Sequence, residues 1–254
     1  MTHKILVVFI LVLSLFSCKN NKKDTNFQID IAIDGIPNGR KAFLKKQVDR
    51  KIIVLDTVIV KDGKFSFKGK IKEPLIFGIF IDSIKRGGIF PFVNVNDHVK
   101  ITAYKDSLNK SKIEGSKLHD ELTQLRIQKE NLNKETQKFL PEYKKANEAK
   151  DTATMNRINK VVKKMNNKLI DRDWNYVKTH TDSYIAPLVF TGLMANPKFK
   201  DSVRIVFNSF SENIKKSDLS KPIKKYFEYL DKLEEKNKKP VASEPVATPT
   251  PSKK

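Results

Sequence analysis

The sequence has 254 residues, of which 39% are hydrophobic, so it is long enough to form one or two domains with an apolar core. Its 50 Lys and Arg residues outnumber its 29 Asp and Glu residues and give a formal net charge of +21. The excess is mainly lysine spread along the whole chain, without an arginine-rich block or an aromatic RNA-binding motif, so no nucleic acid partner is expected. A lysine-rich soluble surface explains this charge, and attraction to an anionic glycan or lipid is the alternative.

The first 17 residues have the pattern of a bacterial lipoprotein signal peptide. Residues 5–16 are almost wholly apolar, and residues 15–18 (Leu-Phe-Ser-Cys) read as a lipobox, in which the chain is cut before the cysteine and the cysteine is acylated. The apolar run is too short for a transmembrane helix, which needs about 20 residues, and it lacks the A-x-A pattern of an ordinary secretory signal. Cys18 is the only cysteine, so we predict that it carries the lipid, including palmitate, and that the mature protein forms no internal disulfide or redox pair.

This N-terminal pattern places the protein in the bacterial cell envelope, on a membrane surface. Residues 18–25 are polar and predict a tether between the lipid and the folded part. No aspartate follows Cys18 directly, which favours the outer membrane, with the protein facing the periplasm.

Residues 26–115 have the pattern of a β domain. Apolar and polar residues alternate over 27–33, which is the period of a half-buried strand. Asp62-Gly63 between two apolar runs predicts a β-hairpin, because this pair favours a tight turn. Short strands punctuated by glycine predict an antiparallel β-sandwich or an open barrel, of which we expect the sandwich. The further strands are expected at residues 42–44, 51–60, 65–69, 75–81, 89–95 and 98–103.

Residues 116–236 change to a helical period. Apolar residues recur at steps of three, four and seven over 118–146 and at alternating steps of three and four over 155–169, which predicts a hairpin of two helices, the first with a seam of the coiled-coil type. Ser116 is expected to cap the first helix, Pro141 to interrupt it, and Asp151 to cap the second. Packing within the protein is one use of this hairpin, and a coiled-coil docking arm for a partner is the other.

Further helices are predicted at 184–195, 199–210 and 223–233, the first of them capped by Asp182-Ser183. Residues 237–254 are rich in Pro, Ala, Ser and Thr and predict a disordered tail. The sequence therefore predicts an α+β protein, with an N-terminal antiparallel β-sandwich followed by an α-helical region that contains a long helical hairpin.

No motif predicts a catalytic, metal or cofactor site. His98, His119 and His180 are far apart in the sequence and lack metal-ligand spacing, and no phosphate-binding loop or nucleophile motif is present. We therefore predict a protein that is not an enzyme and holds no metal or cofactor. An enzyme whose site is assembled from scattered residues is the alternative, and it predicts a deep polar cleft lined by these histidines.

Several segments, in the right order, resemble the DUF4369 domain of Bacteroidetes lipoproteins. They are residues 27–29, 33–35, 43–45, 56–58, 62–69 (Asp-Gly-Lys-Phe-Ser-Phe-Lys-Gly), 74–75, 99–101 and 113–116, and the resemblance covers about residues 26–150 and is looser beyond them, where 182–186 also match. In that family the domain usually precedes a thioredoxin-like domain with a WCxxC motif, as in membrane-anchored thiol:disulfide interchange proteins. This sequence has the Pro-rich tail at that place and no CxxC motif, so the redox activity is not expected to carry over.

We thus expect a non-catalytic envelope lipoprotein, anchored to the membrane through Cys18, that acts as a protein-interaction module. One alternative is a binder of anionic glycan or lipid at the envelope. Another is an accessory to a thioredoxin-like redox protein that acts in trans.

Overall fold

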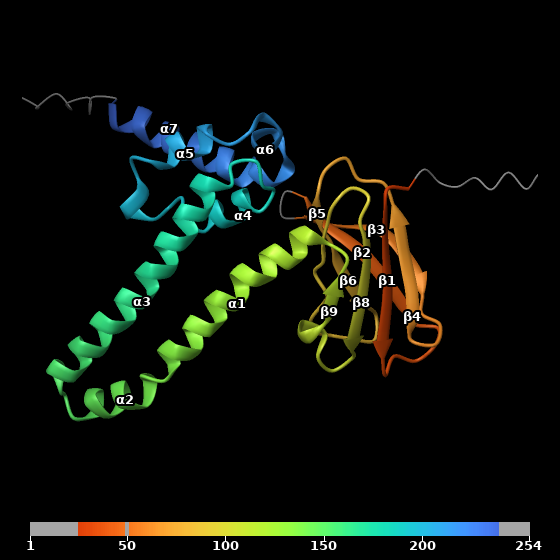
Figure 1. Ribbon diagram of the computed structural model, residues 1–254, viewed down its shortest axis with the longest axis horizontal. Coiled ribbons are helices and arrows are strands. Elements are labelled where there is room, and N and C mark those ends of the chain that lie inside the picture. Colours follow the sequence, from red (N-terminus) through yellow and green to blue (C-terminus); the bar gives the residue numbers. More distant parts are fainter. Residues whose placement is uncertain (1–24, 49–50, 239–254) are drawn as a thin grey trace, which may run out of the picture.

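The computed structural model describes residues 25–48 and 51–238, and within them the protein has the predicted α+β class (Figure 1). A β part comes first and a helical part follows it. The strands are β1 (Phe27–Asp34), β2 (Lys41–Val48), β3 (Lys51–Ile59), β4 (Lys64–Gly69), β5 (Leu75–Ile76), β6 (Gly78–Ile81), β7 (Phe92–Val93), β8 (His98–Tyr104) and β9 (Lys112–Glu114). The helices are α1 (Lys117–Gln137), α2 (Leu140–Glu148), α3 (Thr152–Thr179), α4 (Ala186–Thr191), α5 (Val203–Asn208), α6 (Glu212–Lys216) and α7 (Lys221–Lys238).

The predicted signal peptide, the lipidation residue Cys18 and residues 239–254 of the predicted tail lie outside the described residues. The helical region continues to Lys238 rather than ending at residue 236. Within the described ranges, none of the helices combines the length and the hydrophobicity that crossing a bilayer requires.

Two sheets form the body of the β part. The first sheet has the strand order β4-β1-β8-β9, the second has the order β3-β2-β6, and the short strands β5 and β7 pair beside them. The pairing is antiparallel with one exception, because β1 and β8 run parallel at the centre of the first sheet. The predicted sandwich is therefore mixed rather than wholly antiparallel. The physical reason is that the chain crosses into the second sheet between β1 and β8, and such a crossover allows two strands of one sheet to run in the same direction.

The turn after β3 is the tight turn that the sequence predicts, but it does not make a hairpin. Asp62 and Gly63 both have positive φ, and Lys61 and Lys64 exchange two backbone hydrogen bonds of 2.8 and 3.1 Å. Beyond this point the strands separate, because β3 pairs with β2 in the second sheet and β4 pairs with β1 in the first. The predicted hairpin is thus wrong. Pairing with β1 buries two phenylalanines of β4, Phe65 and Phe67, in the core between the sheets, and this gain decides the partner.

One apolar core lies between the two sheets. The first sheet contributes alternate residues such as Ile29 and Ile31 of β1 and Val99 of β8, all nearly inaccessible to solvent. The second sheet contributes Leu44 of β2 and Ile79 of β6 to the same core. The alternation of apolar and polar residues in β1 therefore reflects a half-buried strand, as the sequence predicts.

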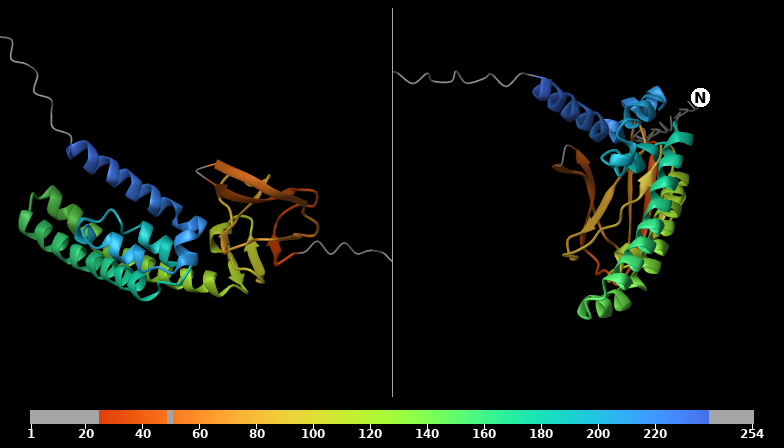
Figure 2. Two further views of the ribbon diagram at one scale, coloured as in Figure 1. Left: turned by 90° about the horizontal axis from the view of Figure 1, so that it is seen from above. Right: turned by 90° about the vertical axis from the view of Figure 1, so that its left-hand side faces the viewer.

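The helical hairpin begins and turns where the sequence predicts. The side chain of Ser116 accepts a hydrogen bond from the His119 N–H at 3.4 Å, and that of Asp151 accepts one from the Thr154 N–H at 3.0 Å, so each residue caps its helix. α1 ends at Gln137, and Pro141 lies in the first turn of α2, where its missing N–H costs no intrahelical bond. α1 and α3 then run side by side as the two long arms of the hairpin (Figures 1 and 2).

The shorter helices after α3 differ from the predicted ranges. Residues 184–195 were expected to be helical, but α4 spans only Ala186–Thr191, because the Ser183 hydroxyl accepts the Ile185 N–H within a preceding turn. Residues 199–210 give only α5, because the preceding turn buries Phe199, whose ring stacks on Trp174 at 3.9 Å between centroids. α7 contains the predicted range 223–233.

Strand β7 connects the β part to the helical part. Phe92 of β7 is fully buried and belongs to the core of the helical part, among residues of α1, α3, α4 and α7. The Ser116 hydroxyl donates to the Phe92 carbonyl at 2.7 Å, and the Phe92 N–H donates to His119 Nδ1 at 3.3 Å. A ring and two hydrogen bonds therefore hold α1 against the sheets.

Candidate functional site

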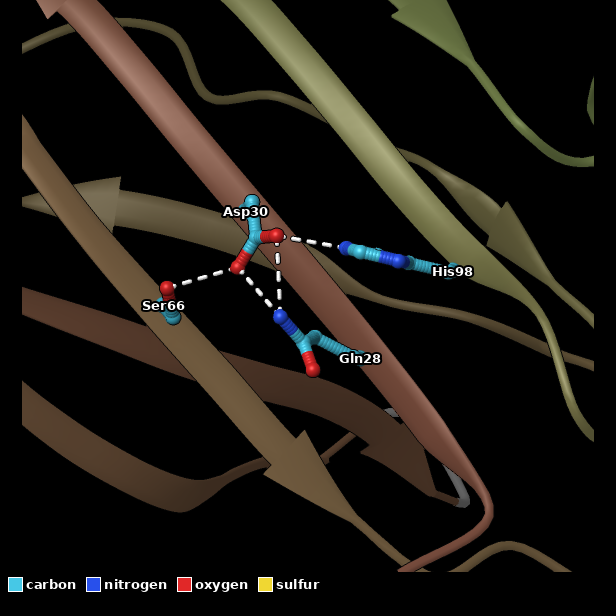
Figure 3. Close-up of polar contacts among 4 residues, drawn as sticks. All are labelled: Gln28, Asp30, Ser66 and His98. Carbon is cyan, nitrogen blue, oxygen red and sulfur yellow. Dashed lines mark hydrogen bonds and ion pairs between the residues drawn. The ribbon is translucent and has the colours of Figure 1, made fainter.

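The outer face of the first sheet carries a cluster of four polar side chains, Gln28, Asp30, Ser66 and His98 (Figure 3). Strand alternation turns Gln28 and Asp30 away from the core. The register then places Ser66 of β4 opposite Asp30, and His98 of β8 opposite Gln28. Three neighbouring strands thus bring together residues that are up to 70 positions apart in the sequence. The strand register, and not closeness in sequence, makes them neighbours.

Asp30 accepts every hydrogen bond within this cluster. Its Oδ1 accepts from the Ser66 hydroxyl at 2.7 Å, its Oδ2 accepts from His98 Nε2 at 2.5 Å, and the Gln28 amide donates to both oxygens at 2.8 and 2.9 Å. Partial burial pushes the pKa of Asp30 upward, but the hydrogen bonds from His98, Ser66 and Gln28 outweigh it and lower the pKa from 3.8 to about 2. The carboxylate is therefore ionised at neutral pH and is a weak base.

The cluster contains a serine, a histidine and an aspartate, but their order does not suit nucleophilic catalysis. A Ser-His-Asp triad requires the histidine between the other two, so that it takes the proton of the serine. Here the aspartate lies between them, and the contacts of the described residues include no bond from Ser66 to His98. We interpret the cluster as a polar link that ties β1, β4 and β8 together on the solvent side.

The other two histidines lie outside this cluster, His119 in the first turn of α1 and His180 at the C-terminal end of α3. His119 is buried at the connection to the sheets, where burial and the nearby Arg126 lower its pKa although Asp120 opposes them. His180 ends α3 and stacks on the Tyr176 ring at 4.1 Å. The structure therefore does not bring His98, His119 and His180 into one cleft, and in the described ranges no group of three or more His, Cys, Asp or Glu residues is arranged to hold a metal ion.

A different surface, on the outer face of the second sheet, is apolar. We call it the apolar face and define it by the side chains that the register turns outward together with the neighbouring Phe90. They are Phe43, Ile52, Val54, Ile59, Phe80 and Phe90. Ile52, Val54 and Ile59 of β3 are 66%, 51% and 55% exposed, and Phe90 is 48% exposed.

The aromatic centre of the apolar face is closely packed. The Phe80 ring lies across Gly78 and Gly88, where a Cβ atom would come within 2.7 and 2.9 Å of ring carbons. Phe90 meets the Phe80 ring edge to face, with 5.8 Å between centroids, and the Lys45 ammonium lies over the same ring at 4.8 Å. The glycines thus let an aromatic side chain lie flat on the outside of the sheet.

β3 is exposed on both of its faces, because Ile53 and Leu55, on either side of Val54, are also more than 40% exposed. In the described part of the chain it is an edge strand, paired on one side with β2, and Figure 2 shows the β2–β3 hairpin at the periphery of the β part. Natural proteins usually blunt such an edge, because free backbone groups beside apolar side chains recruit other chains. The apolar run over 51–60 predicts this strand but not its exposure. A continuous apolar run is typical of a strand buried on both faces, so the sequence pattern predicts burial where the structure has an exposed strand.

The fold thus defines an α+β protein in which two packed β-sheets precede a helical region. Within it, residues 27–122 match the model of a protein family described as "Domain of unknown function (DUF4369)". The N-terminal part of the chain is therefore a DUF4369 domain, as the resemblance predicted, and the match continues into the first turns of α1. A search of the curated proteins found no match to this chain.

Proposed function

We propose that this protein is a non-catalytic envelope lipoprotein, anchored through Cys18, whose β part binds an extended segment of a partner protein by strand addition to β3. One observation carries the binding role, namely an edge strand with large apolar side chains exposed on both faces. These residues are Ile52, Ile53, Val54, Leu55 and Ile59. The anchor rests on the lipobox in the sequence.

Strand addition suits this surface because it uses both of its features. The free edge of β3 offers backbone groups to a new strand, and alternate side chains of that strand would lie against the apolar face. Each Ile, Val or Leu side chain that passes from water to a buried site contributes about 1.5–3 kcal/mol before the cost of ordering the partner. Several such side chains are enough for specific binding of a short segment.

The charge around β3 indicates the chemistry of the partner. Lys41 and Lys45 share the apolar face with Ile59 and Val54, and Lys51 begins β3. We therefore propose a partner segment in which apolar residues alternate with Asp or Glu. A second copy of this chain fits less well, because pairing β3 with β3 brings these lysines together in a chain of net charge +21. A thioredoxin-like protein supplied in trans is the partner that the family resemblance suggests.

Selection of displayed peptides tests this proposal. The full chain is compared with an Ile52→Lys/Val54→Lys variant, and Ile205→Lys serves as a matched control, because Ile205 is 70% exposed on α5. We expect peptides with alternating apolar and acidic residues that bind the wild type and the control alike. The double lysine variant should bind them at least about tenfold more weakly, because it removes apolar contacts of about 1.4 kcal/mol or more.

Amide hydrogen exchange of the complex with a selected peptide completes the test, because added backbone pairing should slow exchange along β3. Peptides that bind the double variant as tightly as the wild type would refute the proposal. So would sedimentation data showing that the chain itself dimerises through these residues, because the occupant would then be a second copy.

A further inference from the structure

An open pocket of about 740 Å³ is lined by residues of both the β part and the helical part, among them Leu75 of β5 and Lys216 of α6. Its volume is in the range of small-molecule sites, which is roughly 300–1,000 Å³. The β part lines it with Lys46, Lys70 and Lys72, and the helical part adds Tyr184, Asn213 and Lys216. Residues far apart in the sequence thus bring four lysines into the lining of one pocket.

The two acidic residues of the pocket are engaged by the protein itself. Glu73 accepts the Asp218 N–H at 2.9 Å, and the Asp218 carboxylate pairs with Lys221 at 2.6 Å. The four lysines outnumber these two acids, so the lining has an excess of positive charge. An anion that enters the pocket therefore meets a favourable potential.

Neutral donors complete the lining. Burial, with a smaller effect of Glu73, raises the pKa of the Tyr184 hydroxyl, so this group keeps its proton and can donate a hydrogen bond. Asn213 also lines the pocket, and its side chain carries an amide that can donate.

The segment that carries Lys70 and Lys72 is held in place. Asn26 bonds both backbone groups of Ile71, donating to its carbonyl at 2.7 Å and accepting its N–H at 2.8 Å. The Glu73–Asp218 bond ties the same segment to the helical part. A site whose walls are already positioned loses less free energy on binding than a mobile one.

We propose that this pocket binds a phosphate-bearing group with more than one negative charge, either a phospholipid headgroup or a soluble phosphate ester. Its described lining contains lysines and no arginine. Ammonium groups act as point charges that suit a phosphate approached from several sides, whereas the planar fork of arginine favours carboxylates as well. This site is distinct from the apolar face and goes beyond the proposed partner binding.

Calorimetric titration with inorganic pyrophosphate is the first test. The full chain is used as its Cys18→Ser form, so that no acyl group interferes. Lys72→Gln/Lys216→Gln removes one lysine from each side of the pocket, and Lys68→Gln/Lys100→Gln removes the same charge from exposed positions on the first sheet. We expect the pocket variant to bind at least about tenfold more weakly, while the control stays within about twofold of the starting protein.

Vesicles distinguish the two sources of phosphate. Binding to phosphatidylcholine vesicles that contain cardiolipin, whose headgroup carries two phosphates, but not to pure phosphatidylcholine, with the same dependence on Lys72 and Lys216, would identify a lipid headgroup. Pyrophosphate binding without vesicle binding would identify a soluble ester. Equal losses in both double variants, or no binding of either probe, would overturn the proposal. The Ile52→Lys/Val54→Lys variant should bind both probes normally, so this test is independent of the one on β3.

Discussion

Single residues in this protein show how a strand register creates an electrostatic environment. Asp30 owes its low pKa to donors from two neighbouring strands and from Gln28 on its own strand. The sequence around Asp30 predicts only that strand alternation turns its side chain outward. The donors from the neighbouring strands that lower its pKa are set by the strand register. The ionised carboxylate therefore stabilises the fold by joining β4, β1 and β8 on their solvent side.

The lowered pKa of Asp30 predicts a specific acid sensitivity. A group whose folded pKa lies below its unfolded value contributes stability that is present above the unfolded pKa and lost as the pH falls through the folded one. For Asp30 this window runs from about 3.8 down to about 2. Urea unfolding followed by circular dichroism should therefore show a steeper loss of stability in this window for the wild type than for Asp30→Asn.

Variants that remove one hydrogen-bond donor to the Asp30 carboxylate test the same prediction. Ser66→Ala and His98→Asn each take away one hydrogen bond to the carboxylate, so each should move the acid transition toward higher pH. Equal slopes for the wild type and Asp30→Asn between pH 3.8 and about 2 would contradict the assignment.

Among the elements, the connection from β9 to α1 depends on a glycine. Gly115 has φ of +89°, and a Cβ atom there would lie 2.2 Å from the His98 carbonyl oxygen. Its neighbour Ser116 caps α1 and bonds β7, so this close approach fixes where the helical part begins.

Gly115→Ala is expected to destabilise the protein strongly. The left-handed conformation costs a non-glycine residue about 1–2 kcal/mol, and the contact with the His98 carbonyl adds to it, for a total of roughly 3 kcal/mol or more. Gly39→Ala is the matched control, since Gly39 has φ of +83° with no atom within 4 Å of its Cβ position. Denaturant midpoints should fall much further for Gly115→Ala, and equal shifts would show that the backbone contact is unimportant.

At the scale of the whole molecule, the two parts are joined through Phe92 and the bonds around it, and the joint leaves a basic pocket beside it. Both proposed binding surfaces involve the second sheet, but the apolar face lies on its outer side, whereas Lys46 of β2, opposite Ile53, points to the other side and lines the pocket. If the lipid is attached at Cys18, both surfaces are held close to a membrane, because few residues separate it from β1.

The anchor itself is tested by Cys18→Ser. Acylation at this residue adds about 0.8 kcal/mol for each buried CH₂ group, which holds the protein on a membrane. The variant should lose acylation and move to the soluble fraction of host cells, as seen by metabolic labelling with palmitate and by fractionation. Asn21→Ala changes the same segment without touching the lipobox and should stay on the membrane. Retention of Cys18→Ser in the membrane fraction would contradict the prediction.

Features that depend on neighbouring residues could be predicted from the amino-acid sequence. The alternation in 27–33 predicted β1, and the caps at Ser116 and Asp151 predicted where α1 and α3 begin. The order of its short motifs predicted the DUF4369 domain. These signals are local, because side-chain period and helix capping act over a few residues.

Strand pairing and surface exposure, by contrast, follow from the packing of the whole chain. The turn at Asp62-Gly63 has its predicted shape, yet β4 leaves β3 for β1, because burial of Phe65 and Phe67 outweighs a local hairpin. The apolar run of β3 lies at an edge, the Asp30 cluster spans three strands, and the basic pocket needs both parts of the chain. Each of these depends on competition among contacts distant in sequence, which no local pattern records.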